Sequence, residues 1–294
     1  MKIATAAYPL DPLTTWADYA NKISNWVIEA AQNGAELLVF PEYASMELAM
    51  LAGPEIAADL PASLRAVSEQ LPDADDLHAD LSARHGVHIL AGSAPVFDTA
   101  IGPYPVNRAR LFSPTGGRGV QDKQIMTRFE RGPMQIVPGG PLRLFDTGVG
   151  KIGILTCYDS EFPLLGRALS EADLILAPSC TEQLSGYWRV RIGAMARALE
   201  NQCVSVMASL VGTATWNHVA DINTGMGGIF GPPDMGFPET GILGLGTLNT
   251  PGWTYAEVDL GAIAHVRADG RVLNRTHWTE QSGRDTQVTS ERLG

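Results

Sequence analysis

The sequence predicts an α/β protein that folds as a single domain. Short apolar runs rich in Val, Ile and Leu alternate along the chain with longer segments whose apolar residues recur at helical spacing. Most predicted strands are apolar on both faces, which is typical of sheets covered on both sides. Proline and glycine are spread along the 294 residues without a Ser-rich or charged linker, so we predict one domain rather than two.

The first half of the chain contains predicted strands separated by two long helices. The strands are residues 2–8, 36–40, 87–92 and 104–112. The helices are residues 14–32, which end at Asn33-Gly34 as a C-cap, and residues 62–84. Pro114-Thr115-Gly116-Gly117 follows the fourth strand and predicts a hairpin turn.

The second half repeats this alternation with shorter elements. The predicted strands are residues 142–146, 151–157, 174–177, 204–209, 227–230 and 255–258, and the helices are residues 162–172 and 186–201. The stretch from Gly148 to Gly153 fits the pattern GxGxxG. Because it lies between two strands and not at a strand-to-helix junction, it predicts a hairpin and not a nucleotide-binding loop.

Cys157 is the most informative residue of the chain. It closes the apolar run 151–156 and precedes Tyr158-Asp159-Ser160-Glu161-Phe162-Pro163, a turn-like stretch that opens a helix. At such a junction backbone N–H groups point outward and favour a thiolate, so the position suits a nucleophile. A free cysteine is more often a small buried hydrophobic residue, and other segments must decide between the two interpretations.

Two segments place charged groups at the ends of other elements. Glu42 follows the apolar strand 37–40 through Pro41, and Lys123 begins a loop that reaches Glu130 seven residues later. A carboxylate, an ammonium and a thiol at such positions supply a base, an oxyanion stabiliser and a nucleophile. Glu130 has two interpretations, because it orients Lys123 or pairs with the arginines on either side of it.

These segments, in this order, resemble the nitrilase superfamily of carbon–nitrogen hydrolases. The resemblance runs from Lys2 to about Trp278 and is closest to amidase-like bacterial members. It implies that Glu42 is the general base, Lys123 binds the oxyanion and Cys157 is the nucleophile, with Glu130 as a second glutamate beside them. It also implies a four-layer α-β-β-α sandwich of two mixed sheets.

The domain prediction follows from the extent of the resemblance. Residues 1–278 form the predicted carbon–nitrogen hydrolase domain. Residues 279–294 are a polar tail that is either frayed or a contact with a partner subunit. Members of the superfamily usually pair through a two-fold interface, so the resemblance implies a homo-oligomer.

The predicted reaction is hydrolysis of a small amide with release of ammonia. Glu42 takes the thiol proton, Cys157 attacks the carbonyl carbon, and Lys123 with the Tyr158 backbone N–H stabilises the anion before a thioester forms. True nitrilases usually carry Trp-Glu after the nucleophile, whereas this chain has Tyr158-Asp159, which favours an amidase. The alternatives are nitrile hydrolysis, acyl transfer on the same triad, or a non-catalytic interaction module.

Glu161 predicts the charge of the substrate. Relatives that act on N-carbamoyl amino acids hold the substrate carboxylate with arginines at the third and fourth positions after the nucleophile, where this chain has Ser160 and Glu161. An acid there repels a carboxylate, so we predict neutral or cationic amides. The alternative is that Glu161 pairs with Arg189 or Arg191 on the neighbouring predicted helix.

Other candidate substrate-binding residues surround these positions in the predicted topology. They are Tyr43, Phe162, Cys180, Thr181, Tyr187 and Trp188. The Gly/Pro-rich stretch 225–238 is long enough to be a loop over the site or a subunit contact.

Composition excludes several other classes of protein. A net charge of −11 argues against a nucleic-acid partner, whose phosphates require a basic face. Three cysteines at long spacings indicate free thiols and a reducing, cytoplasmic compartment. No apolar run approaches the ~20 residues of a membrane span, and the six histidines lack metal-ligand spacing, so we predict no membrane contact, metal or cofactor.

Overall fold

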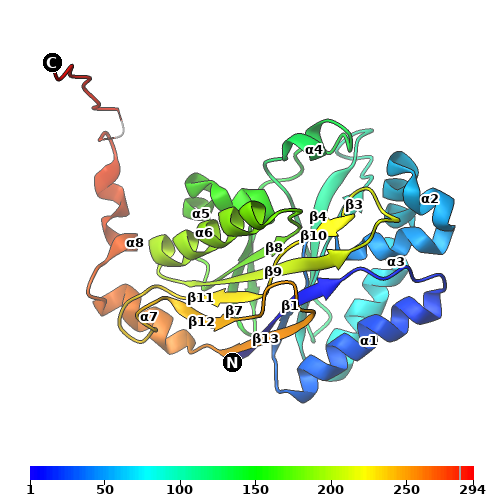
Figure 1. The fold of residues 1–294 in the computed structure, drawn as a ribbon. Coiled ribbons are helices and arrows are strands. Elements are labelled where there is room, and N and C mark those ends of the chain that lie inside the picture. The colour runs from blue at the N-terminus through cyan, green and yellow to red at the C-terminus, as the bar shows by residue number, and fades with distance from the viewer. Residues whose placement is uncertain (285) are drawn as a thin grey trace.

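The computed structural model describes residues 1–284 and 286–294, which form a mixed sheet flanked by helices (Figure 1). Nine strands lie side by side along the main path of the sheet. In spatial order they are β5 (Arg118–Asp122), β4 (Val106–Phe112), β3 (His88–Val96), β2 (Leu37–Val39), β1 (Lys2–Pro9), β9 (Val204–Thr213), β8 (Leu174–Ser179), β7 (Gly150–Ile154) and β6 (Leu144–Thr147). The predicted α/β class is confirmed.

The remaining strands pair off this path. β10 (Ile222–Asn223) and β11 (Gly228–Phe230) pair with β9, β12 (Ile242–Leu245) pairs with β11, and β13 (Gly252–Glu257) pairs with β1. The helices are α1 (Trp16–Gln32), α2 (Pro54–Ala58), α3 (Leu60–His85), α4 (Arg128–Arg131), α5 (Pro163–Ala168), α6 (Leu184–Asn201), α7 (Leu260–Asp269) and α8 (Asn274–His277). Three 3₁₀ segments, η1 (Ala44–Ala52), η2 (Cys157–Glu161) and η3 (Trp278–Gln281), complete the chain.

The sheet has two halves that are joined at one short pairing. β1 and β9 are parallel neighbours only at Ala7–Ser209, Tyr8–Leu210 and Pro9–Val211. We predicted two sheets, whereas this pairing connects the two halves into one hydrogen-bonded path. The ladder continues because β1 and β9 run in the same direction and are paired over these three residues of each strand.

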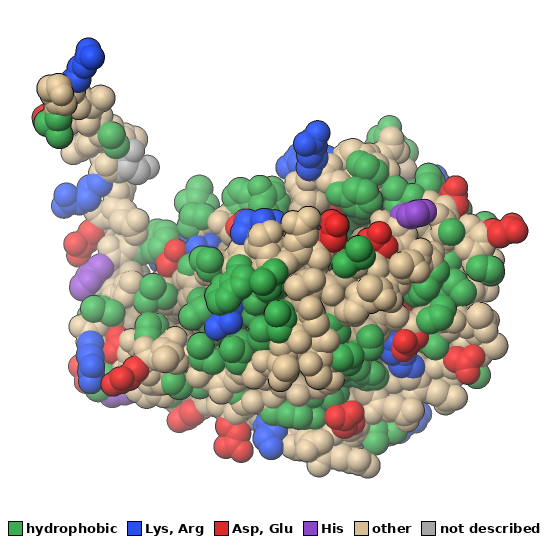
Figure 2. All heavy atoms as spheres, viewed as in Figure 1, with side chains coloured by type: hydrophobic (Ala, Val, Ile, Leu, Met, Phe, Trp, Pro, Cys, Tyr) green, Lys and Arg blue, Asp and Glu red, His purple; other side chains and the backbone are tan. Residues whose placement is uncertain are grey.

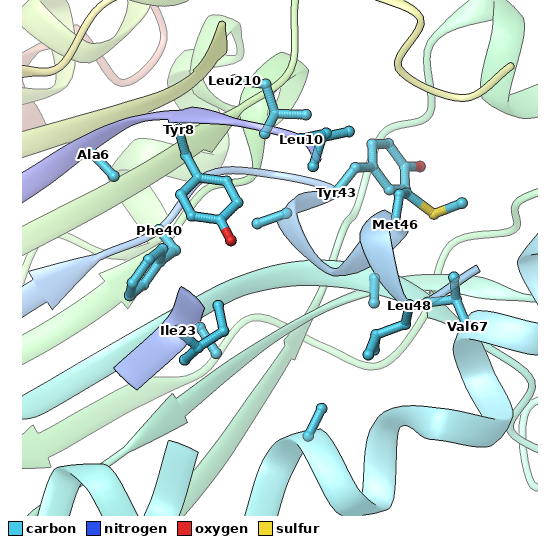
Figure 3. Packing of buried hydrophobic residues seen from close by; sticks show 14 of the residues in the cluster. Ala6, Tyr8, Leu10, Ile23, Phe40, Tyr43, Met46, Leu48, Val67 and Leu210 are labelled. Carbon is cyan, nitrogen blue, oxygen red and sulfur yellow. The ribbon is translucent and has the colours of Figure 1, made fainter. Parts of the chain in front are cut away.

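Two large apolar cores hold the layers together, and two smaller ones lie beside them. Buried side chains of β1, β2 and β3 share one core with those of β7, β8 and β9, so the two halves of the sheet pack against each other. On the other face of the first half, Ile23 and Val27 of α1 and Val67 of α3 pack onto the strands. Figure 3 shows Tyr8 and Phe40 in this second core, with Tyr43 and Met46 nearby.

The direction of the strands determines where a site forms. β1, β2 and β3 are parallel, as are β7, β8 and β9, and the β1–β9 pairing aligns both groups. The carboxyl ends of β2, β7 and β8 therefore point to the same side of the molecule. In open α/β sheets this is the side on which ligands bind.

Several predicted elements need correction. The strand predicted at 151–157 ends at Ile154, and Cys157 begins the 3₁₀ segment η2 instead. The helix predicted at 162–172 covers only 163–168, and β5, β12 and α7 were not predicted. The GxGxxG stretch forms the β6–β7 hairpin as predicted, because Thr147 pairs with Gly150 across the turn.

Residues 286–294 lie away from the body of the molecule (Figure 2). Val288 and Leu293 in this segment are exposed. Among the described residues, no helix combines the length and the apolar character that crossing a membrane requires.

Candidate active site

A cavity of about 800 Å³ opens at the carboxyl ends of β2, β7 and β8. Glu42, Lys123, Glu130 and Cys157 all line it. Segments from the beginning, the middle and the second half of the chain therefore meet in one space, as the strand order requires.

Glu42 is positioned by a turn that packs closely against β3. Tyr43 adopts a left-handed conformation (φ 59°), and its N–H donates to Ser93 Oγ at 3.2 Å. Gly92 permits this packing, because a Cβ at that position would lie 2.1 Å from the Pro41 carbonyl oxygen. The turn directs the Glu42 carboxylate inward, where only 1% of the residue remains exposed.

Lys123 and Glu130 are positioned by the segment between β5 and α4. The Lys123 N–H donates to the Asn107 carbonyl at 2.8 Å, which holds the start of this segment against β4. Glu130 belongs to a capping box at the start of α4, in which Thr127 is the N-cap. Its carboxylate accepts the Thr127 N–H at 2.8 Å and is thereby turned back toward Lys123.

Cys157 is held in a sharp turn directly after β7. Its φ of 50° lies in the left-handed region, which is costly for a residue with a side chain. The turn is fixed because Ser160 Oγ donates to the Cys157 carbonyl at 2.7 Å and Arg197 Nη1 donates to the Ser160 carbonyl at 3.0 Å. Gly193 lets α6 approach this turn closely, because a Cβ added at Gly193 would lie 2.7 Å from the Ser160 carbonyl oxygen.

The Lys123 ammonium lies between two carboxylates. Its Nζ donates to Glu42 Oε1 at 2.8 Å and to Glu130 Oε2 at 2.7 Å. The Tyr43 hydroxyl donates to Glu130 Oε1 at 2.8 Å. The sequence left open whether Glu130 contacts Lys123 or the neighbouring arginines, and this geometry places it on Lys123.

The main chain of Cys180 links the base position to the thiol. Its N–H donates to Glu42 Oε2 at 3.0 Å. Its carbonyl oxygen accepts the Cys157 thiol at a sulfur–oxygen distance of 3.7 Å. A single residue at the end of β8 therefore contacts both the Glu42 carboxylate and the Cys157 sulfur.

Burial and charge shift the pKa values of these groups in different directions. Burial disfavours a charged Lys123, but the carboxylates of Glu42 and Glu130 outweigh it and hold its pKa well above the ordinary value. Burial raises the pKa of Glu42, whereas at Glu130 the ammonium and several hydrogen bonds overcome burial and lower the pKa. Burial, together with the Glu42 carboxylate, raises the pKa of Cys157, so its thiol needs a base before it attacks.

Of the other sequence-predicted residues, Tyr43, Tyr158, Glu161, Cys180 and Thr181 line the cavity. The side chain of Glu161 also forms an ion pair with Arg189, with 3.5 Å between Oε1 and Nε. The predicted pairing with Arg189 is confirmed, and Arg189 lines the same cavity. The effect of Glu161 on the charge of the substrate stays a prediction.

Phe162, Tyr187 and Trp188 are not among the lining residues, which corrects their predicted place in the cavity wall. The Phe162 ring lies edge-on to Tyr158 with 4.8 Å between centroids. Tyr187 is buried in the core beneath α6, and Trp188 is 45% exposed with the Arg191 guanidinium over its ring. Helical geometry explains the difference, because Trp188 lies on a different face of α6 from the cavity.

Sequence reasoning missed two sets of residues at this site. Asn107 contacts both glutamates but lies in a strand, where a single polar residue gives no distinct signal. The cavity also includes Arg128, at the start of the short helix α4, and Glu182, His218 and Asp221, which belong to loops. A sequence pattern does not predict the conformation of these segments. Within the described residues, no three His, Cys, Asp or Glu side chains are grouped as metal ligands.

Comparison with known sequences assigns the chain to a family. The sequence model of the carbon–nitrogen hydrolase family matches residues 2–268, and the chain belongs to this family. Proteins named as amidases are among its relatives and its structural neighbours.

Three curated relatives illustrate this membership. A probable hydrolase, YhcX, of Bacillus subtilis (strain 168) is 32% identical over 277 residues, which cover 92% of this chain and 52% of the relative. A deaminated glutathione amidase of Yersinia enterocolitica is 31% identical over 163 residues, or 49% of this chain and 56% of that protein. The omega-amidase NIT2-B of Xenopus laevis is 25% identical over 267 residues, or 85% and 86% of the two chains. The chain thus spans about half the length of the first two relatives.

Solved structures show the same fold. The amidase from Nesterenkonia sp. AN1, seen with acrylamide added to its active-site cysteine, matches with a TM-score of 0.66 and 24% identity, covering 92% of this chain and 97% of that one. The NitFhit protein of C. elegans matches with a TM-score of 0.75 and 18% identity, covering 98% of this chain and 66% of that one.

Proposed function

We propose that the protein hydrolyses the C–N bond of a small amide and releases ammonia through a thioester on Cys157. The observation that carries this proposal is the position of the Lys123 ammonium between two carboxylates, in the cavity that Cys157 lines. A buried ammonium in that position is a fixed positive charge, and such charges stabilise an anion that develops in the transition state.

The first step makes the carbon–sulfur bond. Glu42 takes the thiol proton, and the Cys157 sulfur attacks the amide carbon, which places a negative charge on the carbonyl oxygen. Lys123 has three N–H donors and uses two on the glutamates, so the third is available to this oxygen. The Tyr158 N–H, which donates to no protein group in the described part of the chain, is the second donor.

The second step breaks the C–N bond. The protonated Glu42 passes its proton to the departing nitrogen, ammonia leaves, and the acyl group remains on Cys157 as a thioester. Glu42 then accepts a proton from a water molecule that attacks the thioester. The tetrahedral anion collapses, the carboxylic acid product leaves, and the proton on Glu42 returns to the Cys157 sulfur.

The outer part of the cavity supports a neutral or cationic substrate. Glu161, Glu182 and Asp221 line it together with Arg128 and Arg189. The ion pair with Glu161 offsets part of the Arg189 charge, which leaves fewer free cations to hold a substrate carboxylate. The relatives named as deaminated glutathione amidase and omega-amidase support an amide as the reacting group.

Ammonia release from a panel of amides tests the proposal. The panel contains neutral, cationic, ω-carboxylated, α-carboxylated and N-carbamoyl amides together with the matching nitriles. We expect release from neutral or cationic amides that Cys157→Ala abolishes and that Cys203→Ala preserves, because Cys203 lies in a separate buried core. Release from nitriles alone, or from amides in the Cys157→Ala protein, would overturn the proposal.

We also infer the finer architecture and assembly. The core shared by the two halves of the sheet supports a four-layer α-β-β-α sandwich within a domain at 1–278.

Exposed apolar side chains over α5 and α6 (Figure 2), among them Leu164 at 77% and Ile192 at 62%, support a homo-oligomer, with the 279–294 tail as a subunit contact. Light scattering on the full chain and on a chain ending at residue 278 tests this, and a monomeric full chain would refute it. A cytoplasmic location without nucleic-acid partners stays a prediction from composition.

A further inference from the structure

Asn107 contacts three of the four charged or reactive positions of the site. It lies in β4, and none of its surface is exposed. Its Nδ2 donates to Glu42 Oε1 at 2.9 Å and to Glu130 Oε1 at 3.1 Å. Its main-chain oxygen accepts the Lys123 N–H at 2.8 Å. The neutral amide of Asn107 therefore bridges the two carboxylates. Among the described residues, the only other side chain that donates to both carboxylates is Lys123.

The hydrogen bonds of Glu130 are complete. A carboxylate has about four lone-pair positions, two on each oxygen. Oε1 accepts the Tyr43 hydroxyl and Asn107 Nδ2, and Oε2 accepts Lys123 Nζ and the Thr127 N–H. A proton can bind Glu130 only after it displaces one of these four donors.

Glu42 has one lone-pair position left. Its Oε1 accepts Lys123 Nζ and Asn107 Nδ2, so that oxygen is complete. Its Oε2 accepts only the Cys180 N–H among the described residues. Glu42 and Cys157 line the same cavity, so the open position on Oε2 is available to the thiol proton.

We propose that Asn107 is a positioning residue that determines which glutamate accepts the proton of Cys157. By occupying one lone pair on Oε1 of each carboxylate, Asn107 completes the shell of Glu130 and leaves Oε2 of Glu42 as the single open acceptor. The inference rests on the proposed function, in which Glu42 is the base, and it adds the reason that Glu130 is not.

A purely structural role explains the same residue less well. The Oδ1 atom of Asn107 is buried without a hydrogen-bond partner among the described residues, and burying an unsatisfied polar atom is unfavourable. If the position served only to fill space, an apolar residue of similar volume would avoid that cost. The two hydrogen bonds from Nδ2 to the glutamates are what an apolar residue would not provide.

The variant Asn107→Leu tests the proposal through the reactivity of Cys157. We measure the rate of alkylation by iodoacetamide against pH, with mass spectrometry to identify the modified cysteine. Loss of a hydrogen bond to a carboxylate favours its protonated form, so Glu42 loses its function as a base at higher pH than in the wild type. We expect the acidic limb of the profile to move up by about one pH unit, since such bonds change an equilibrium tenfold or more.

Other titrating or charged groups lie around Glu42 and contribute to the pH profile of the wild type and of the variant. They are Lys123, Glu130, Tyr43, Cys157, Cys180 and Asp159. Because all six are common to the wild type and the variant, the difference between the two profiles reports the loss of Asn107.

A matched control is Asn201→Leu. Asn201 is also fully buried, its Nδ2 donates to one carbonyl, that of Gly166 at 2.9 Å, and its Oδ1 also lacks a partner in the described residues. It does not line the cavity. We expect this variant to lose stability without any movement of the acidic limb.

The outcomes separate this inference from the proposed function. If Cys157 of the wild type reacts no faster than Cys203, the proposed function is wrong. If Cys157 reacts selectively and Asn107→Leu leaves the acidic limb where it was, the role of Asn107 is wrong and the proposed function stands. If Asn107→Leu does not fold, Asn107→Ser decides: its hydroxyl serves one carboxylate only, and a profile equal to the wild type overturns the inference.

Discussion

Replacing Lys123 by methionine removes the charge between the two glutamates and keeps a side chain of similar length. In the wild type the ammonium is buried and donates to Glu42 at 2.8 Å and to Glu130 at 2.7 Å. After the change, two carboxylates face each other without a cation, although both remain buried. The variant thus loses the proposed oxyanion donor and also acquires two buried carboxylates without a cation.

The loss of stability has a defined size and pH dependence. Removing one partner of a buried ion pair costs about 3–5 kcal/mol, which a domain of ordinary stability, about 5–15 kcal/mol, tolerates. Unpaired burial raises the folded-state pKa of a carboxyl above its unfolded value. Its contribution to stability is therefore present at low pH and is lost as the pH rises. In the wild type the pKa of Glu130 is lowered, so its contribution is lost as the pH falls.

The raised carboxyl pKa in the variant and the lowered Glu130 pKa in the wild type act in the same direction. Together they predict that the stability difference between wild type and variant grows with pH. Urea unfolding at about pH 5 and about pH 8 measures it, and we expect ~3–5 kcal/mol at the higher pH. At the lower pH we expect a difference smaller by at least ~1 kcal/mol, since one pKa unit corresponds to about 1.4 kcal/mol. Turnover should fall by about 100-fold or more at every pH, because the proposed oxyanion donor is gone.

Lys22→Met is the matched control for this experiment. Lys22 forms ion pairs with the buried Glu47 and with Asp11, outside the cavity. We expect it to lose stability and to keep turnover. A stability difference for Lys123→Met that is equal at both pH values would refute the reasoning, because no buried carboxylate would then have been released.

Three further substitutions test other contacts of the site. Glu161→Gln should improve kcat/KM for α-carboxylated amides relative to neutral ones, because it frees the paired arginine; an unchanged ratio in steady-state kinetics would remove Glu161 from the specificity argument. Tyr43→Phe deletes a hydroxyl that donates to Glu130 at 2.8 Å and should cost about 1.5–3 kcal/mol in urea unfolding, with no loss if that bond is absent in solution. Gly193→Ala should cost about 1–3 kcal/mol and lower kcat, because its Cβ would lie 2.7 Å from the Ser160 carbonyl; equal kcat and unfolding curves would contradict this packing.

The sequence was sufficient for the class of the fold because apolar runs and helical spacing are local signals. It was not sufficient for the end of β7. Leu155 still donates its N–H to Leu176 in the neighbouring strand, so the apolar run continues beyond the ladder. The turn that follows depends on Arg197 and Gly193 of α6, which are distant in sequence and give no local signal.

The wall of the cavity shows the same limit at α6. Gly186, Arg189 and Val190 line the cavity, and their spacing of three and four residues places them on one helical face. Trp188 falls between these positions and therefore points elsewhere. An aromatic residue near the site was a reasonable candidate, but the phase of the helix decides the outcome, and the phase depends on packing.

Glu42 and Glu130 illustrate what a sequence does not specify about a site. Both are buried glutamates that contact the same ammonium, and residue type alone does not distinguish a base from a permanent anion. The distinction that we propose lies in the number of donors, which are four on Glu130 and three on Glu42. Those donors come from several separate segments, so only the folded chain determines them.

The backbone beside Glu42 and the backbone at Cys157 are strained in the same way. Tyr43, next to Glu42, and Cys157 itself both adopt left-handed conformations, with φ values of 59° and 50°. For residues other than glycine this costs about 1–2 kcal/mol each, and such strain persists where the surrounding structure enforces it. Both turns follow the carboxyl end of a parallel strand, and each is held by a contact with a glycine, at Gly92 and Gly193. The sharp reversals bring a carboxylate and a thiol from opposite halves of the sheet into one cavity, which a relaxed extension of either strand would not achieve.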